Sequence, residues 1–214
     1  MPFTCSEFAT QIQIQILTLG VMLWNATASC SNTSHLKVNG AMDVAWMQNE
    51  LWVAAKSTVE CWDSTTATRK SSKRCSQVAN AIAVCRSAAA SANDDGSIYV
   101  YNDRSSSPIH TLVDSMNLPQ TAVCFSSNGD FIFSAGIANS ISVWDLASNS
   151  IAYLLEGHYD TVTGLALSPN GNFLLSNAMD NSVRVWDVRP FAVGATREYR
   201  VLDGKSYFLS QIWV

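Results

Sequence analysis

A short segment of alternating apolar residues that ends in an aromatic residue and then Asn or Asp occurs five times in this 214-residue chain. Successive copies lie about 40 residues apart. Alternation with a period of two is typical of a β-strand, so the same strand is predicted once in each of five consecutive units. The copies are VMLWNA at 21–26, VECWDS at 59–64, IYVYND at 98–103, ISVWDL at 141–146 and VRVWDV at 183–188.

Turn signals between these strands support a β-structure for each unit. SSNGD at 126–130 and SPNGN at 168–172 place an Asn-Gly pair between two β-like runs, and DDGS at 94–97 is a similar signal one unit earlier. Asn-Gly between alternating apolar residues is a strong hairpin signal. A repeat of about 40 residues with several short strands is typical of four-stranded blades, so we predict an all-β propeller with about five recognisable blade units.

The composition is that of a folded chain with few charges. Hydrophobic residues make up 48% and charged residues 14%, the net charge is -4 and the pI is about 5.2. This charge repels phosphate backbones, so sequence-specific nucleic-acid binding is not expected. No apolar stretch reaches the length of a membrane helix, and the six cysteines contain no Cys-x-x-Cys pair. We therefore expect a soluble chain with free thiols in a reducing compartment, without membrane contact.

The repeated segments resemble the WD-repeat family of β-propellers over about residues 20–192. The last unit matches best, because Gly157-His158 and Asp187 stand at the spacing of the family motif. The resemblance implies a structural hydrogen-bonded tetrad made of His158, Ser176, Asp180 and Trp186. Other units depart from the motif: Tyr101 replaces Trp in the third, Ala138 stands where Asp is expected in the fourth, and Asn39 stands where His is expected in the second.

A closer resemblance lies in LEGHYDTVTGLALSPNGNFLLSNAMDNSVRVWDVRPFA, at 155–192. This segment is similar to the WD-repeat subfamily of the U5 small nuclear ribonucleoprotein, a particle of the spliceosome. The resemblance implies a nuclear, non-catalytic scaffold in pre-mRNA splicing that needs no cofactor. Its expected partners are the large central splicing factor of that particle and other U5 proteins.

The box WDVR at 186–189 supports an alternative function. In WD-repeat substrate receptors of cullin-type ubiquitin ligases, Asp and Arg at these positions contact the ligase adaptor. Asp187 and Arg189 are therefore candidates for partner binding. The competing interpretation is that Asp187 caps a turn and Arg189 is a surface charge.

The resembled family forms a seven-bladed ring, which needs roughly 280–300 residues. We therefore expect a truncated chain; a ring closed differently or completed by another chain is the alternative. The predicted organisation is a degenerate N-terminal strand region at 1–20, propeller units at 21–192 and an unmatched tail at 193–214.

Patterns of catalysis are not found in the sequence. In GKS at 204–206 the glycine that a phosphate-binding loop requires five positions earlier is Tyr199. The predicted innermost strands, such as TAVCFS at 121–126, are small and apolar, and the three histidines are scattered at 35, 110 and 158. We predict no enzyme activity and no metal site.

Two stretches suggest binding instead. Tyr159, Asp160 and Met179 lie next to predicted tetrad residues, and we expect them to project outward as contacts for a partner. RKSSKR at 69–74 holds four cations in six residues and is predicted as a solvated loop, with a nuclear-import patch or an RNA-backbone contact as alternatives.

Overall fold

The computed structural model describes residues 4–5, 12–17, 20–25, 33–86, 88–102, 104–105, 107–190 and 197–203. These residues form five antiparallel sheets of four strands, each made of strands that follow one another in the chain. The first sheet contains β1 (Thr4–Cys5), β2 (Ile12–Leu17), β3 (Gly20–Asn25) and β4 (Thr33–Leu36); the second contains β5 (Ala41–Met47), β6 (Glu50–Ala55), β7 (Thr58–Asp63) and β8 (Thr68–Arg74). The third contains β9 (Ala79–Cys85), β10 (Ala88–Asn93), β11 (Ser97–Asn102) and β12 (His110–Val113); the fourth contains β13 (Gln120–Phe125), β14 (Phe131–Gly136), β15 (Ile141–Asp145) and β16 (Ser150–Leu155); the fifth contains β17 (Val162–Leu167), β18 (Phe173–Ala178), β19 (Ser182–Asp187) and β20 (Glu198–Asp203).

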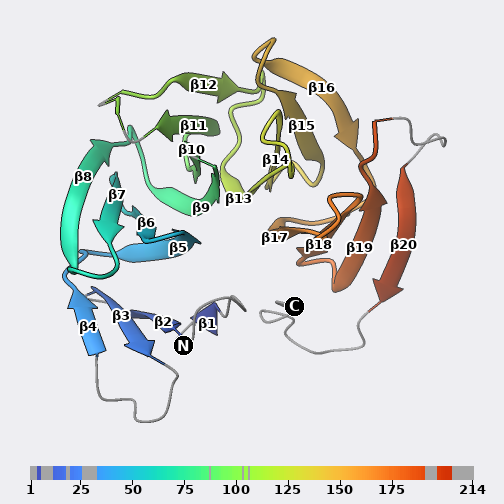
Figure 1. Ribbon diagram of the computed structural model, residues 1–214. Coiled ribbons are helices and arrows are strands. Elements are labelled where there is room, and N and C mark those ends of the chain that lie inside the picture. Colours follow the sequence, from blue (N-terminus) through green and yellow to red (C-terminus); the bar gives the residue numbers. More distant parts are fainter. Residues whose placement is uncertain are drawn as a thin grey trace.

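The sheets stand side by side in an arc, with the first strand of each towards the centre and the fourth at the rim (Figure 1). Neighbouring sheets pack through their first strands, β5 on β9, β9 on β13 and β13 on β17. The five repeated segments are the third strands β3, β7, β11, β15 and β19. The predicted all-β fold of four-stranded blades is therefore confirmed.

The Asn-Gly turns are hairpins between the first and second strands of the fourth and fifth sheets. Gly129 and Gly171 have φ of 76° and 72°, a conformation that glycine adopts without the strain of a Cβ atom. Each glycine N–H donates to the carbonyl of the serine that opens its turn, at 2.9 and 2.8 Å. DDGS also forms a turn, but it joins the second and third strands, β10 and β11, so it is not the counterpart of the other two.

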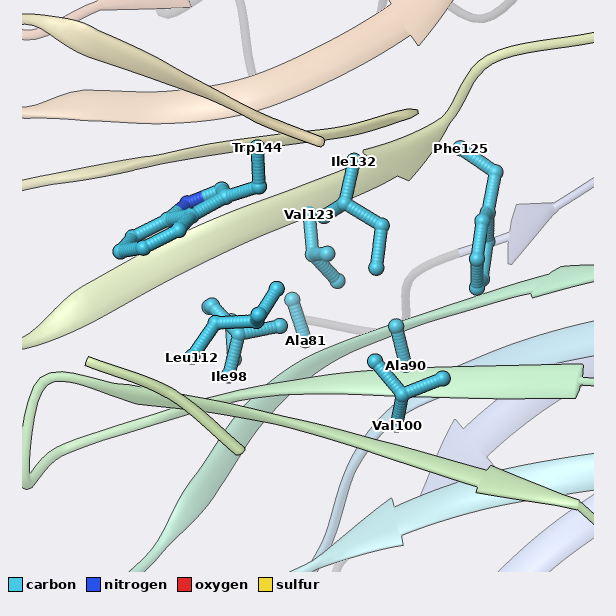
Figure 2. Packing of buried hydrophobic residues seen from close by; sticks show 10 residues of the cluster. Ala81, Ala90, Ile98, Val100, Leu112, Val123, Phe125, Ile132 and Trp144 are labelled. Atoms are coloured by element: carbon cyan, nitrogen blue, oxygen red, sulfur yellow. The ribbon is translucent and has the colours of Figure 1, made fainter. Parts of the chain in front are cut away.

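The core lies between the sheets, and Figure 2 shows the part between the third and fourth. The third sheet contributes Ala81, Ala90, Ala92, Ile98, Val100 and Leu112; the fourth contributes Val123, Phe125, Ile132 and Trp144. Small alanines on one sheet face large side chains on the other, which lets two sheets approach closely without voids. Each large apolar side chain buried in this way stabilises the fold by roughly 1.5–3 kcal/mol.

Polar bonds near the centre also join neighbouring sheets. Ile82 N–H donates to Asp43 Oδ2 at 2.8 Å, and Asn80 Nδ2 donates to the carbonyl of Gln120 at 3.0 Å. Thr121 Oγ1 donates to the carbonyl of Val162. Asn80 and Thr121 stand at β-bulges, where the chain turns a side chain out of the regular pleat. The bulges thus supply hydrogen bonds from one sheet to the next.

The basic segment 69–74 is not a loop, as predicted, but most of β8, the rim strand of the second sheet. Lys73 is only 2% exposed, and its Nζ donates to the carbonyl of Ser105. Arg69 pairs with Glu60 at 3.2 Å and Lys70 pairs with Glu50 at 3.0 Å. Long cationic side chains can cover a rim strand with their aliphatic stems while their charges reach partners, and this is why a polar sequence forms a strand here.

The two ends of the chain add strands to the outer sheets. Glu198–Asp203, inside the segment 193–214 that carries no repeat motif, forms β20 and pairs with β19. Thr4–Cys5 and Ile12–Leu17, inside the segment 1–20, form β1 and β2. The predicted domain limits themselves stay a prediction.

Thiols and hydropathy add two observations. Cys61, Cys75, Cys85 and Cys124 are free thiols, and burial raises the pKa of Cys124 to about 11. The side chains of Cys5 and Cys30 lie outside the described residues. No helix long and apolar enough to cross a membrane is found among the residues that the structure describes.

Candidate functional site

Six loops gather at one end of the third, fourth and fifth sheets, because each joins a fourth strand to the next first strand or a second strand to a third. We call them the loop face. They are residues 75–78, 94–96, 114–119, 137–140, 156–161 and 179–181. The hairpins between first and second strands, and the turns between third and fourth, lie at the opposite end.

In the fifth sheet four side chains form a continuous hydrogen-bonded chain under this face. Trp186 Nε1 donates to Ser176 Oγ at 2.8 Å, and Ser176 Oγ lies 2.7 Å from His158 Nε2. His158 Nδ1 lies 2.8 Å from Asp180 Oδ2. Since Ser176 accepts the indole proton, its own proton donates to Nε2, and His158 then donates from Nδ1 to the carboxylate. The structure thus brings together the four residues of the expected tetrad, from β18, β19 and two loops.

Asp180 is the acceptor on which several of these bonds meet. It also accepts from Tyr159 N at 3.0 Å, Ser182 N at 2.9 Å and Ser182 Oγ at 2.7 Å. Burial alone would raise the pKa of Asp180, but the donors on Ser182, Tyr159 and His158 lower it to about 2. Burial lowers the pKa of His158, which the bond to Asp180 only partly offsets. At neutral pH the pair is therefore a carboxylate and a neutral imidazole.

The network fixes the two loops that hold the predicted contact residues. Met179 N donates to the carbonyl of Thr161 at 2.9 Å, so loop 179–181 is fastened to loop 156–161. Tyr159 is 82% exposed and Met179 is 62% exposed. Asp160, which follows Tyr159 in the loop before β17, is also exposed. All three predicted contact residues thus lie on neighbouring parts of one face.

Arg184 supports the ring of Tyr159 from below. Its guanidinium lies 5.5 Å from the centre of that ring and forms an ion pair with Glu198. A cation over an aromatic face is attracted by the ring quadrupole. A Cβ atom on Gly157 would lie 2.7 Å from Arg184 Nη1 and 3.0 Å from the Trp186 ring, so the Gly-His pair reflects close packing as well as the tetrad.

The third sheet builds a related network from different residues, which the sequence motif did not reveal. Tyr101 Oη lies 3.4 Å from Cys75 Sγ, and Ser76 Oγ donates to Asp95. Tyr99 Oη also donates to Asp95, at 3.1 Å. Cys75 and Ser76 together thus occupy the place of the histidine. The available signal was Asp95 four residues after Ser91, as Asp180 follows Ser176.

The fourth and second sheets keep only part of the network. In the fourth, Trp144 Nε1 donates to Ser134 Oγ at 2.9 Å, and Ala138 supplies no carboxylate. In the second, Trp62 Nε1 donates to Glu60 Oε2 at 3.0 Å, a carboxylate on its own strand, and Asn39 is exposed. The indole N–H groups of Trp62 and Trp144 thus keep a partner, whereas that of the buried Trp52 in β6 has none among the described residues.

Asp187 and Arg189, the candidates for an adaptor contact, lie at the end opposite to the loop face and bind each other. Arg189 Nε lies 2.9 Å from Asp187 Oδ1, and Nη2 lies 2.5 Å from Oδ2. The hydrogen bond from Arg189 lowers the pKa of Asp187. A second arginine, Arg197, donates from Nη1 to the carbonyl of Arg189 at 2.9 Å. This pair therefore stabilises the turn after β19.

Groups of three or more His, Cys, Asp or Glu side chains that could hold a metal ion are absent from the described part of the chain. The GKS segment at 204–206 lies outside the described residues.

Comparisons with known proteins agree with this fold. The family model "WD domain, G-beta repeat" matches residues 106–145 and 149–187. The chain is 35% identical over 148 residues to the U5 small nuclear ribonucleoprotein 40 kDa protein of Dictyostelium discoideum, an alignment that covers 64% of this chain and 41% of the relative.

Among solved structures, a chain in the crystal structure of the mitotic checkpoint complex superposes with a TM-score of 0.78 at 20% identity, over 90% of this chain and 62% of that one. At this identity the likeness shows the fold alone. The chain spans less than two thirds of the length of either protein. The repeat match, the strand order and the likeness to the solved structure together show that residues 106–187 carry WD repeats and that the described residues form four-stranded blades of the β-propeller fold.

Proposed function

We propose that the chain is a non-catalytic scaffold that binds partner proteins through its loop face. The observation that carries this proposal is the pair Tyr159 and Met179, two large exposed side chains on loops fixed by the buried tetrad. Aromatic and methionine side chains are enriched in protein interfaces. Because the loops are already ordered, binding need not order them at the expense of affinity.

The more specific proposal is a role in the U5 small nuclear ribonucleoprotein, in the nucleus and in pre-mRNA splicing. It is supported by the 35% identity to the U5 protein of Dictyostelium and by the family resemblance of residues 155–192. The large central splicing factor of the particle, with other U5 proteins, is the proposed partner. Asp187 and Arg189 bind each other, so a ligase adaptor would have to break an ion pair to reach them.

The first experiment is affinity purification of the tagged full chain from nuclear extract, with the recovered proteins identified by mass spectrometry. We expect U5 proteins to be recovered. Replacing Tyr159 and Met179 together with Ala should lower their recovery about tenfold, since exposed aromatic anchors carry much of an interface's binding energy. Tyr199→Ala is the matched control, because Tyr199 is an exposed tyrosine on the rim strand β20.

Two outcomes would contradict the proposal. Recovery of U5 proteins that is equal for the double variant and for Tyr199→Ala would show that another surface binds. Recovery of a cullin-ligase adaptor without U5 proteins, lost in Asp187→Asn with Arg189→Ala, would favour the alternative function.

A further inference from the structure

The loop face exposes two large apolar side chains in addition to Tyr159 and Met179. Met116 is 64% exposed and Ile137 is 48% exposed, and both stand on loops of the same face. Ile137 N donates to the carbonyl of Pro119 at 3.2 Å, so these two loops are also joined. We call Met116, Ile137, Tyr159 and Met179 the apolar patch. Four large apolar side chains at one end of two neighbouring sheets are typical of an interaction surface.

The charges on the same loops all have one sign. The loop face carries six carboxylates and neither lysine nor arginine. The carboxylates belong to Asp94, Asp95, Asp114, Glu156, Asp160 and Asp180. At the opposite end, Arg86, Arg104 and Arg189 are exposed on the hairpins and turns, together with Asp130. The six loops of the loop face therefore carry only negative charges, while the second sheet exposes Lys37, Lys56 and Arg74 at the same end.

The hydrogen-bond donors to these carboxylates are neutral groups. Asp94 Oδ1 accepts from Asn80 Nδ2 at 2.6 Å, and Asp160 Oδ1 accepts from Thr161 N at 2.6 Å. Asp114 Oδ1 accepts from Ser115 Oγ at 3.2 Å. No lysine or arginine of the described residues forms a salt bridge with any of the six. The charges of the exposed Asp94, Glu156 and Asp160 and of the half-buried Asp114 thus remain available to a partner, whereas Asp180 is nearly inaccessible to solvent.

We propose that the loop face binds a cationic segment of a partner protein, whose lysines or arginines meet the carboxylates and whose apolar side chains cover the patch. The inference rests on the proposed scaffold function and names the chemistry of its partner. Nucleic acid and anionic membrane surfaces are repelled by the same field. Opposite charges around an apolar centre raise the rate of association and select the partner.

The test is selection of a displayed library of random 12-residue peptides on the full chain, followed by affinity measurement of the enriched peptides. The test variant replaces Asp94, Asp114 and Asp160 with Asn. Each side chain keeps one acceptor oxygen, and three negative charges are removed. The control replaces Asp130 and Asp145 with Asn, two carboxylates at the opposite end.

We expect enriched peptides that combine net positive charge with large apolar residues. Their affinity should fall about tenfold in the three-residue variant and fall with added salt, but stay unchanged in the control. Enrichment of neutral or acidic peptides, no enrichment, or equal affinity for variant and control would each overturn the proposal. Self-association of the chain through the end that exposes Arg86, Arg104 and Arg189, abolished by the three-residue variant, would mean that a second copy is the occupant and would equally overturn it.

The purification from nuclear extract distinguishes a failure of the cationic-partner proposal from a failure of the proposed splicing role. Selected cationic peptides with no U5 proteins recovered would leave the surface in place and refute the splicing role. Recovered U5 proteins with no selected peptides would leave the scaffold in place and refute the cationic partner.

Discussion

His158 Nδ1 lies 2.8 Å from Asp180 Oδ2, and this bond joins the loop before β17 to the turn before β19. Both side chains are nearly inaccessible to solvent. The bond is one link in a chain that continues through Ser176 to the buried indole of Trp186. The position of the exposed Tyr159 thus depends on a hydrogen bond in the interior, because its backbone N–H is held by the same carboxylate.

Removing either partner should destabilise the fold. His158→Ala and Asp180→Ala each leave a buried polar partner unsatisfied, and we expect a loss of about 2 kcal/mol in the free energy of unfolding. The measurement is urea denaturation of the variants and of a control, His110→Ala, which removes a rim histidine bonded to Asn149. The double variant should lose less than the sum of the single losses, and strict additivity would contradict a shared network.

Stability should fall in acid through His158. Its pKa is lowered in the folded chain from the ordinary value of 6.5, so the unfolded chain binds this proton first as the pH falls. The contribution of the neutral imidazole is complete above pH 6.5 and is lost as the pH falls below that value towards the folded pKa. Denaturation of wild-type and His158→Gln at pH values on both sides of 6.5 checks this. Parallel pH profiles for the two chains would contradict it.

Asp43 should act in the opposite direction. Burial raises its pKa to about 6, although the N–H groups of Ile82 and Val44 donate to it. The folded chain therefore holds the proton longer, and stability is lost as the pH rises from 3.8 to about 6. In Asp43→Asn this dependence disappears, so its stability relative to wild type should increase over that range and then stay level. A constant difference at all pH values would show that Asp43 titrates normally.

A side chain on Gly157 should disturb the packing below the tetrad. The added methyl of Gly157→Ala would lie too close to Arg184 and Trp186, and we expect a loss of roughly 1–3 kcal/mol. Thermal denaturation compares this variant with Ser148→Ala, an exposed change expected to cost less than about 0.5 kcal/mol. Equal midpoints for both variants would show that the site relaxes without strain.

Ala138→Asp should restore the missing carboxylate of the fourth sheet. Asp95 and Asp180 each accept the backbone N–H two residues later, on Ser97 and Ser182, and Ser140 stands at the matching position. We expect a gain of about 0.5–1 kcal/mol in the free energy of unfolding. The same variant should tighten binding of a cationic peptide, since it adds a charge to the loop face. Weaker binding would contradict the proposed electrostatics.

Much of the fold could be predicted from local patterns. The alternation of VRVWDV and the Asn-Gly turns depend on residues close in the chain, and both formed the predicted strands and hairpins. The basic β8 was missed, since charge density suggested a loop while backbone pairing with β7 and partners such as Glu60 made a strand. The strand β8 carries no apolar residue, so its local composition does not distinguish it from a loop.

By itself, the sequence determined the repeat, its period and the identity of the four side chains that meet in the fifth sheet, under the loop face. Only the tertiary structure decided which groups substitute for them elsewhere, as Cys75 and Ser76 do, and that Asp187 and Arg189 bind each other. It also decided that six carboxylates from loops far apart in the chain share one face. The physical reason is that strand alternation and turns act over a few residues, whereas hydrogen-bond partners and surface charge depend on which loops the packed sheets bring together.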